Sequence, residues 1–170
     1  MDKSLLDLQP ISRIRRNHGL EHATIHVLNK KYPEIPFAGV SSARGFTLIG
    51  DVPTEEVALA AIEALKKMRA GQSDLAYHPN CGTNFAVSGL FAGLAAWLGM
   101  LGSDKKIKHQ LERLPLVILL ATTAFILTRS LGPRIQKEIT TSGEPDGLEL
   151  TRVETSVRGG IRMHKVITKG

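Results

Sequence analysis

Two apolar stretches in the second half of the chain constrain its fold more than any other feature. Residues 75–102 contain no charged side chain, and Asn84 to Gly102 alone spans 19 residues. That length is close to the ~20 residues that a helix needs to cross a hydrocarbon core of ~30 Å. Small residues recur in this stretch at Gly89, Gly93 and Gly99, as in helices that pack closely within membranes. We favour a membrane span over the alternative, a helix buried in a soluble core.

A second apolar stretch, Leu114 to Thr128, has only 15 residues before Arg129. It spans a bilayer if it continues through Gly132 and the Arg129 side chain reaches the membrane surface. The connection between the two stretches, Ser103 to Arg113, is short and charged. The sequence therefore predicts a transmembrane helical hairpin over residues 84–132, with both termini on one side of the membrane.

Charge and cysteine content give the expected location. The net charge of +6 suits contact with anionic lipid, and we expect a lipid bilayer but no nucleic acid as partner. Six basic residues near the spans lie on the side of the termini and four lie in the connection, which weakly favours cytoplasmic termini. These residues are Lys66, Lys67, Arg69, Arg129, Arg134 and Lys137 against Lys105, Lys106, Lys108 and Arg113. A single cysteine excludes an internal disulfide and fits a reducing compartment. We expect a two-span protein of the cell membrane.

The segments that flank the hairpin have the patterns of a small α+β domain. Two helices and about four antiparallel strands are expected, with the strands in two hairpins that join one sheet. The helices are expected at Arg13–Lys31, with Ser12 as cap, and from the capping residue Thr54 to Arg69; the strands at residues 37–41, 45–50, 148–157 and 161–168. The soluble domain would thus consist of residues 1–83 and 133–170, interrupted by the hairpin.

The first candidate site lies on the first of these helices. His18-Gly19-Leu20-Glu21-His22 has the pattern H-x-x-E-H. Two histidines four residues apart on a helix point in similar directions, as ligands to one metal ion must. A catalytic zinc takes about three protein ligands and keeps one position open for water. Glu21 lies at the adjacent edge, where it could polarise that water, as in the inverted zincins.

The alternative for this motif is a surface helix with incidental histidines. One observation opposes it, because His18 and Glu21 fall on the apolar stripe of the helix, and a carboxylate there is costly unless it is paired or near a metal. The stripe consists of Ile14, His18, Glu21, Ile25 and Leu28. Gly19 costs ~1 kcal/mol relative to alanine within a helix, so we expect another segment to pack closely against it. His26 continues the row from His22. It is a candidate third ligand, an outer-sphere group or an exposed residue, and we favour the last two.

The second candidate site, His78-Pro79-Asn80-Cys81, places an imidazole and a thiol just before the first apolar stretch. Both groups are good zinc ligands. A cysteine nucleophile with a histidine base is an enzymatic alternative. A free cysteine buried at a helix start is the structural alternative.

The two motifs together resemble the YqhQ-like family of uncharacterised bacterial membrane proteins, and a related membrane family of unknown function. The family patterns are H-G-x-E-H-x-x-I and H-P-x-C-G-T-x-F, which match residues 18–25 and 78–85 here. The resemblance implies a metal-dependent membrane protein, and its candidate functional positions are His18, Glu21, His22, His78 and Cys81. This chain differs from the YqhQ-like pattern in being short and having only two spans.

The sequence thus favours a membrane-anchored, metal-dependent hydrolase, specifically a peptidase of the inverted-zincin type. His18 and His22 would bind zinc with His78 or Cys81 as third ligand, and Glu21 would accept a proton from the zinc-bound water. The substrate would be a membrane-associated protein or peptide. The alternative is a structural zinc site with four protein ligands, in an assembly factor, a homo-oligomer or a subunit of a larger membrane complex. A thiol enzyme that uses Cys81 and His78 without metal is a third option.

Overall fold

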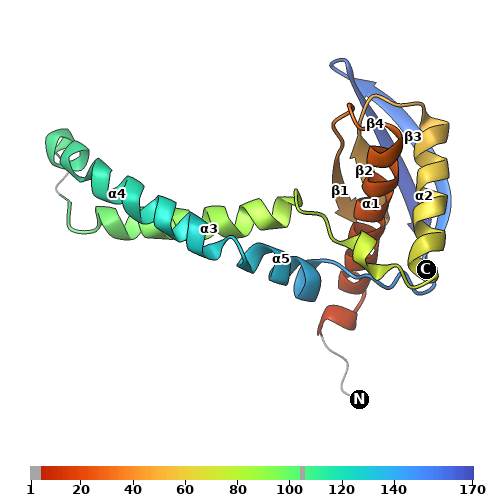
Figure 1. The fold of residues 1–170 in the computed structure, drawn as a ribbon, viewed down its shortest axis with the longest axis horizontal. Coiled ribbons are helices and arrows are strands. Elements are labelled where there is room, and N and C mark those ends of the chain that lie inside the picture. The colour runs from red at the N-terminus through yellow and green to blue at the C-terminus, as the bar shows by residue number, and fades with distance from the viewer. Residues whose placement is uncertain (1–4, 104–105) are drawn as a thin grey trace. The chain divides into compact units, whose positions relative to one another are not determined.

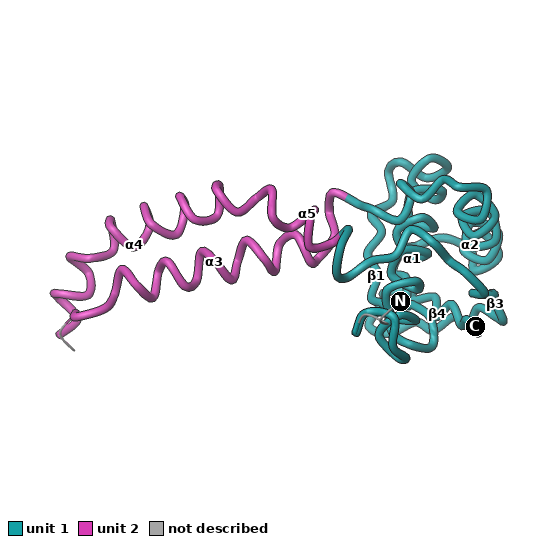
Figure 2. Tube along the Cα trace, turned by 90° about the horizontal axis from the view of Figure 1, so that it is seen from below, with its two compact units in different colours: residues 1–78, 137–170 teal, residues 79–136 magenta. Residues whose placement is uncertain are grey.

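The computed structural model describes residues 5–103 and 106–170, and the chain divides into two compact units, each of which is considered by itself (Figures 1 and 2). Unit 1 comprises residues 1–78 and 137–170, and unit 2 comprises residues 79–136. Both predicted boundaries of the apolar hairpin, 84 and 132, lie inside unit 2. Unit 2 is thus an insertion within the sequence of unit 1.

Unit 1 is an α+β domain, as the sequence predicted. Its four strands form one antiparallel sheet in the order β1-β2-β4-β3, so the two predicted hairpins do join. The strands are β1 (Ala38–Ser42), β2 (Gly45–Ile49), β3 (Glu149–Arg158) and β4 (Ile161–Lys169). The helices α1 (Ile11–Lys31) and α2 (Thr54–Arg69) lie side by side against this sheet, and the short helices η1 (Leu5–Asp7) and η2 (Ser73–Ala76) precede α1 and follow α2 (Figure 1).

The core of unit 1 lies between the helices and the sheet. The four α2 residues predicted to share one face, Val57, Ala61, Leu65 and Met68, are all buried, because a spacing of three to four residues aligns them along a helix. They pack with Leu20 and Leu28 of α1, Phe46 and Leu48 of β2, Val166 of β4, and Leu148. Burial of aliphatic and aromatic side chains at ~25 cal/mol per Å² is the main stabilising contribution in such a core.

Both helices of unit 1 begin differently from the prediction. Helix α1 begins at Ile11 with Pro10 in the capping position, so Ser12 lies within the helix. Helix α2 begins at Thr54 with Pro53 in the capping position, so Thr54 is not the cap. Proline suits the edge of a first turn because the N–H group that it lacks would have no partner within the helix.

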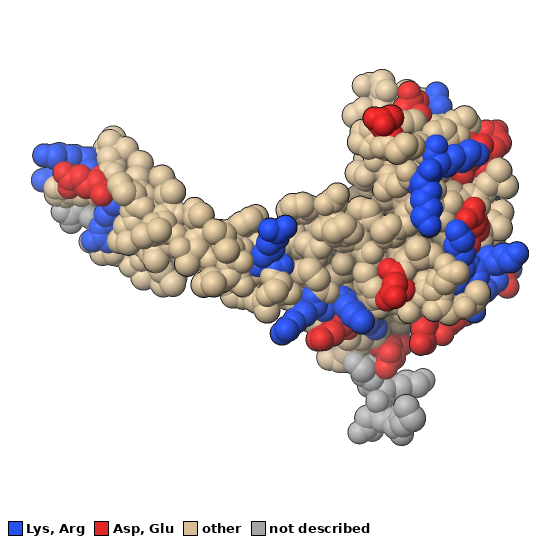
Figure 3. Space-filling view, in the orientation of Figure 1, with Lys and Arg blue, Asp and Glu red and all other residues tan. Residues whose placement is uncertain are grey.

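Unit 2 contains two helices that are long and apolar enough to cross a membrane. They are α3 (Gly82–Met100), with mean hydropathy 1.3, and α4 (Ile107–Thr128), with mean hydropathy 1.7. Within the most apolar 18-residue segment of each helix, only 11% (α3) and 6% (α4) is buried in the protein. This exposure opposes the alternative of a soluble core helix. Charged side chains gather at the tip of this hairpin, and a long uncharged surface follows on the face viewed in Figure 3. A short helix, α5 (Leu131–Ile135), and a π-helical turn, η3 (Gln136–Thr140), lead back to unit 1.

The hairpin differs from the prediction in two details. Helix α4 begins at Ile107 rather than near Leu114, so Arg113 belongs to the helix; Lys105 of the connection lies outside the described residues. The predicted packing of small residues holds only at the tip, where a β-carbon on Gly99 would lie 3.1 Å from the side chain of Val117. A β-carbon added at Gly89 or at Gly93 would have no neighbouring atom within 4 Å, so these two glycines do not mark a close contact between the helices.

Candidate metal centre

Helix α1 carries three histidines on one side. The ring centroids of His18 and His22 lie 4.4 Å apart, as expected for residues one helical turn apart. His22 is buried and His18 is partly buried. His78 follows η2 in the sequence, and its ring centroid lies 5.9 Å from that of His22 and 4.8 Å from that of His26. We call His18, His22, His26 and His78 the histidine cluster.

The backbone holds the first two rings in one protonation form. The Nδ1 atom of His18 lies 2.9 Å from the carbonyl oxygen of Thr140, and the Nδ1 atom of His22 lies 2.8 Å from that of Ala76. A carbonyl oxygen only accepts hydrogen bonds, so each Nδ1 carries a proton, and Nε2 is the nitrogen through which each ring could bind a metal. Metal-binding histidines are oriented in this way in proteins, by an outer hydrogen bond from the nitrogen that does not bind the metal.

His26 is held in the opposite form. Its Nε2 atom lies 2.9 Å from the carbonyl oxygen of Tyr77, so Nε2 carries the proton. The group of potential ligands formed by His18, His22 and Cys81 does not include His26, which fits the favoured outer role of this residue. Burial raises the pKa of the neighbouring Tyr77 phenol, which therefore stays neutral at physiological pH.

Cys81 completes a group of three potential ligands. The ligand atoms of His18, His22 and Cys81 all lie within 4.8 Å of one another. The sequence also keeps the thiol near the histidines, because Cys81 follows His78 by three residues, a span of at most ~11 Å. Two imidazoles and a buried thiol form a set that could hold a transition-metal ion, and zinc is one of the metals that accept such ligands.

Glu21 is buried beside the sheet, with 3% of its surface exposed. Its Oε2 atom accepts a hydrogen bond from the hydroxyl of Ser41 in β1. Its other carboxylate oxygen lies against Gly39, where a β-carbon would approach to 2.4 Å. The carboxylate on the apolar stripe is therefore paired, as its burial requires, and the pairing residue is one that sequence reasoning missed. Neither the spacing nor the type of Ser41 gave a signal for this contact.

Gly19 lies under a crossing segment, as predicted from its cost within a helix. A β-carbon at this position would lie 2.1 Å from the carbonyl oxygen of Ser142 and 3.2 Å from the β-carbon of Ala76. The same crossing segment supplies the Thr140 carbonyl that holds His18. Ile14, at the N-terminal end of the apolar stripe, is 37% exposed. The crossing segment binds α1 through the Ser142–Arg15 backbone hydrogen bond and leaves the first turn of the helix uncovered.

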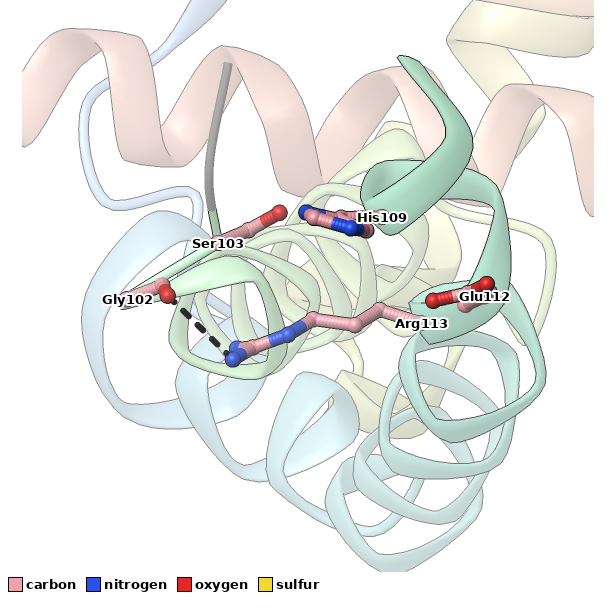
Figure 4. A pocket seen from close by; sticks show the side chains of 5 residues that line it. All are labelled: Gly102, Ser103, His109, Glu112 and Arg113. Carbon is pink, nitrogen blue, oxygen red and sulfur yellow. Dashed lines mark hydrogen bonds between the residues drawn. The ribbon is translucent and has the colours of Figure 1, made fainter. Parts of the chain in front are cut away.

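A polar hollow lies at the tip of the hairpin. It has a volume of about 260 Å³ and is lined by Gly102, Ser103, His109, Glu112 and Arg113 (Figure 4). The guanidinium group of Arg113 donates to the carbonyl oxygens of Gly99, Leu101 and Gly102. These carbonyls end α3 and need donors, so Arg113 closes the helix end rather than presenting its charge to a ligand.

The fold and the site define a class: an α+β protein with two helices long and apolar enough to cross a membrane, and with a His/Cys group that could hold a metal ion. The chain belongs to the family of the domain of unknown function DUF6391, whose model matches residues 13–153. An uncharacterised protein of Picosynechococcus sp. PCC 7002 is 34% identical over 148 residues, which cover 79% of this chain and 69% of that protein. No solved structure matches the chain. An uncharacterised family is thus confirmed, and the narrower resemblance to the YqhQ-like proteins stays a prediction.

Proposed function

We propose that this protein is a membrane-anchored, metal-dependent hydrolase, with a peptidase of the inverted-zincin type as its specific form. The observation that carries the proposal is the pair of neighbouring imidazoles, His18 and His22, each oriented by a hydrogen bond from Nδ1 to a backbone carbonyl, as metal-binding histidines are. Cys81 is the third ligand in this proposal, and the metal is zinc. Three protein ligands leave one position for water, which is the arrangement of catalytic rather than structural zinc sites.

The protein residues have defined roles in this proposal. When bound, zinc supplies Lewis acidity, which polarises a carbonyl group and makes water acidic enough to ionise near neutral pH. Glu21 accepts the proton of the attacking water and passes it to the leaving group. Ser41 fixes the Glu21 carboxylate through its hydrogen bond. Thr140 and Ala76 hold the two imidazoles through their carbonyl oxygens.

The proposed location follows from the two apolar helices. We propose that α3 and α4 cross the cell membrane as a hairpin, and that unit 1 and both termini lie in the cytoplasm. The metal ligand Cys81 directly precedes α3, so the site would lie at the membrane surface. A membrane-associated protein or peptide is the substrate that this location favours. The YqhQ-like resemblance supports the same reading, because it implies metal-dependent membrane proteins.

A structural metal site is the second candidate, and two contacts favour it. His78 lies beside His22, with 5.9 Å between their ring centroids, and would supply a fourth ligand after a small shift. The hydrogen bond from Ser41 gives the Glu21 carboxylate a structural partner. In this candidate the protein is an assembly factor or a subunit of a membrane complex.

Metal analysis with X-ray absorption spectroscopy distinguishes the two candidates without a known substrate. For the purified full-length protein we expect one zinc ion per chain, with one sulfur ligand, two imidazoles and one further oxygen ligand. A closed set of one sulfur and three imidazoles would support the structural candidate. Absence of bound metal after supplementation with zinc would overturn both.

A variant tests the role of Glu21. Glu21→Gln keeps the size of the side chain but removes its basicity, so zinc should stay bound while hydrolysis of a panel of fluorogenic peptides falls to background. His26→Gln is the matched control on the same helix, and its activity should persist. Loss of zinc from Glu21→Gln, or unchanged hydrolysis, would contradict the proposed role.

A further inference from the structure

Helix α1 holds both segments of unit 1 that connect to the apolar hairpin. On the incoming side, His22 binds the carbonyl of Ala76 and His26 binds that of Tyr77. On the returning side, His18 binds the carbonyl of Thr140. The returning segment is held further by Arg15, whose guanidinium donates to Glu138 and Thr141 and whose carbonyl accepts from Ser142. The two connecting segments also meet each other, where the Lys137 ammonium lies 5.6 Å from the ring of Tyr77.

These contacts place one edge of unit 1 close to any membrane that the hairpin crosses. His78 precedes the start of α3 at Gly82 by only four residues, and Lys137 follows the end of α4 at Thr128 by nine residues. Nine residues rise ~14 Å along a helix, so the returning segment cannot move far from the end of the span. Because α1 holds both segments, α1 itself must lie at this edge.

The first turns of α1 expose apolar side chains at the same edge. Five of the ten large hydrophobic residues that are exposed in the described part of unit 1 lie in residues 5–14 and in the returning segment. They are Leu5, Leu8, Ile11, Ile14 and Ile139, which we call the N-terminal apolar patch. Leu8 and Ser12 are joined by a backbone hydrogen bond that continues η1 into α1, and Ile139 neighbours Glu138, which Arg15 holds. A concentration of exposed apolar side chains of this kind marks a contact surface.

We infer that the N-terminal apolar patch rests on the lipid surface, so that unit 1 contacts the bilayer directly beside the spans. This inference rests on the proposed insertion of α3 and α4 in a membrane. We take the lipid surface to be the partner of the patch, because the short connecting segments hold the patch next to the membrane. Lys137 is exposed at the same edge, so its side chain suits the head-group region, whereas the guanidinium groups of Arg13 and Arg15 donate to backbone carbonyls of unit 1. Asp7 and Glu138 offset much of this charge, so the contact depends chiefly on apolar burial.

Quenching of tryptophan fluorescence by brominated phospholipids tests this contact in the full-length protein. The only tryptophan, Trp97, lies in α3 and reports whether the hairpin is inserted. In a Trp97→Phe background, Ile11→Trp places a probe in the patch. Val157→Trp is the control, because Val157 is also exposed but lies near the β3–β4 turn, at the opposite end of unit 1 from the start of α1 (Figure 1). The probes are compared in vesicles of phosphatidylcholine with and without brominated acyl chains.

We expect the Ile11→Trp variant to show a blue-shifted emission that brominated lipid quenches, and the Val157→Trp variant to show neither. Adding Ile14→Asp to the Ile11→Trp variant should reduce the quenching, because a carboxylate opposes burial in the lipid surface. Equal quenching of the two probes, or none at Ile11→Trp while native Trp97 is quenched, would overturn the inference. Absence of quenching at native Trp97 would instead overturn the proposed insertion on which it rests.

Discussion

The Nδ1 atom of His18 donates a hydrogen bond of 2.9 Å to the carbonyl oxygen of Thr140, which lies 122 residues later in the chain. This contact joins the first helix to the segment that returns from the apolar hairpin. It also fixes the proton on Nδ1 and leaves Nε2 as the atom that can bind a cation. One hydrogen bond thus contributes both to the packing of the returning segment on α1 and to the orientation of a candidate metal ligand. A change at His18 or in the returning segment should therefore affect both the stability of unit 1 and metal binding.

The histidines of α1 should differ in their effect on metal binding. His22→Ala removes one of the three proposed metal ligands, so the bound metal should fall from one per chain to a trace. His26→Ala removes an imidazole whose Nε2 atom is already engaged with Tyr77, and metal should remain. Inductively coupled plasma mass spectrometry of the two purified variants checks this prediction. Equal metal content in both would show that the cluster is not a metal centre of the proposed kind.

Gly19→Ala should destabilise unit 1 although alanine favours helix formation. The added β-carbon would meet the Ser142 carbonyl at 2.1 Å, and this backbone cannot rotate away as a side chain would. Overpacking of this kind costs ~1–3 kcal/mol, which exceeds the gain of ~1 kcal/mol in helix propensity. Thermal unfolding of the full-length protein in detergent measures the effect. Gly147→Ala is the control, because no atom lies within 4 Å of its added β-carbon; similar melting temperatures for the two variants would contradict the prediction.

The parts of the fold that could be predicted from the sequence are those set by neighbours along the chain. The buried face of α2 follows from a spacing of three to four residues, and the apolar helices follow from long uncharged runs. The carbonyl partners of His18 and His22 could not be predicted, because main-chain contacts depend on where distant segments cross. The same holds for Ser41, which pairs with Glu21 across the gap between helix and sheet. Periodicity identifies the apolar stripe that includes Ile14 but not how far another segment covers it, and Ile14 is 37% exposed.

Acid should destabilise unit 1 through His164. This residue of β4 is buried, its Nε2 atom lies 3.2 Å from the Gly50 carbonyl oxygen, and its Nδ1 atom has no hydrogen-bond partner. Burial lowers the pKa of His164 below the ~6.5 of an unfolded chain, so the folded state holds the neutral ring. Stability from this residue is therefore complete above pH ~6.5 and is lost as the pH falls below that value.

The variant His164→Gln isolates this effect from that of the other histidines. Glutamine can still donate to the Gly50 carbonyl but does not titrate. Chemical unfolding of the metal-free protein should therefore show a smaller loss of stability between pH 7 and pH 5 for the variant than for the wild type. The same pH dependence in both proteins would assign the acid sensitivity to other groups.

Ser41→Ala should destabilise the protein by removing the hydrogen-bond donor to the buried Glu21 carboxylate. Hydrogen bonds to charged groups contribute ~1.5–3 kcal/mol, and a buried carboxylate left without this donor carries its desolvation cost as well. Ser156→Ala in β3 is the control, because Ser156 is exposed and its replacement should change stability by less than ~0.5 kcal/mol. Denaturant unfolding of both variants measures the difference.

A double-mutant cycle shows whether that loss belongs to the Glu21–Ser41 pair. Glu21→Gln alone, Ser41→Ala alone and the combined variant give a coupling free energy, which for contacting residues is ~0.5–3 kcal/mol. If Ser41 acts by holding the carboxylate, the two changes should be less than additive, because Glu21→Gln already removes the charged acceptor that Ser41 stabilises. Strict additivity would mean that Ser41 stabilises β1 without acting on Glu21, and a role for Ser41 in positioning the proposed base would then be wrong.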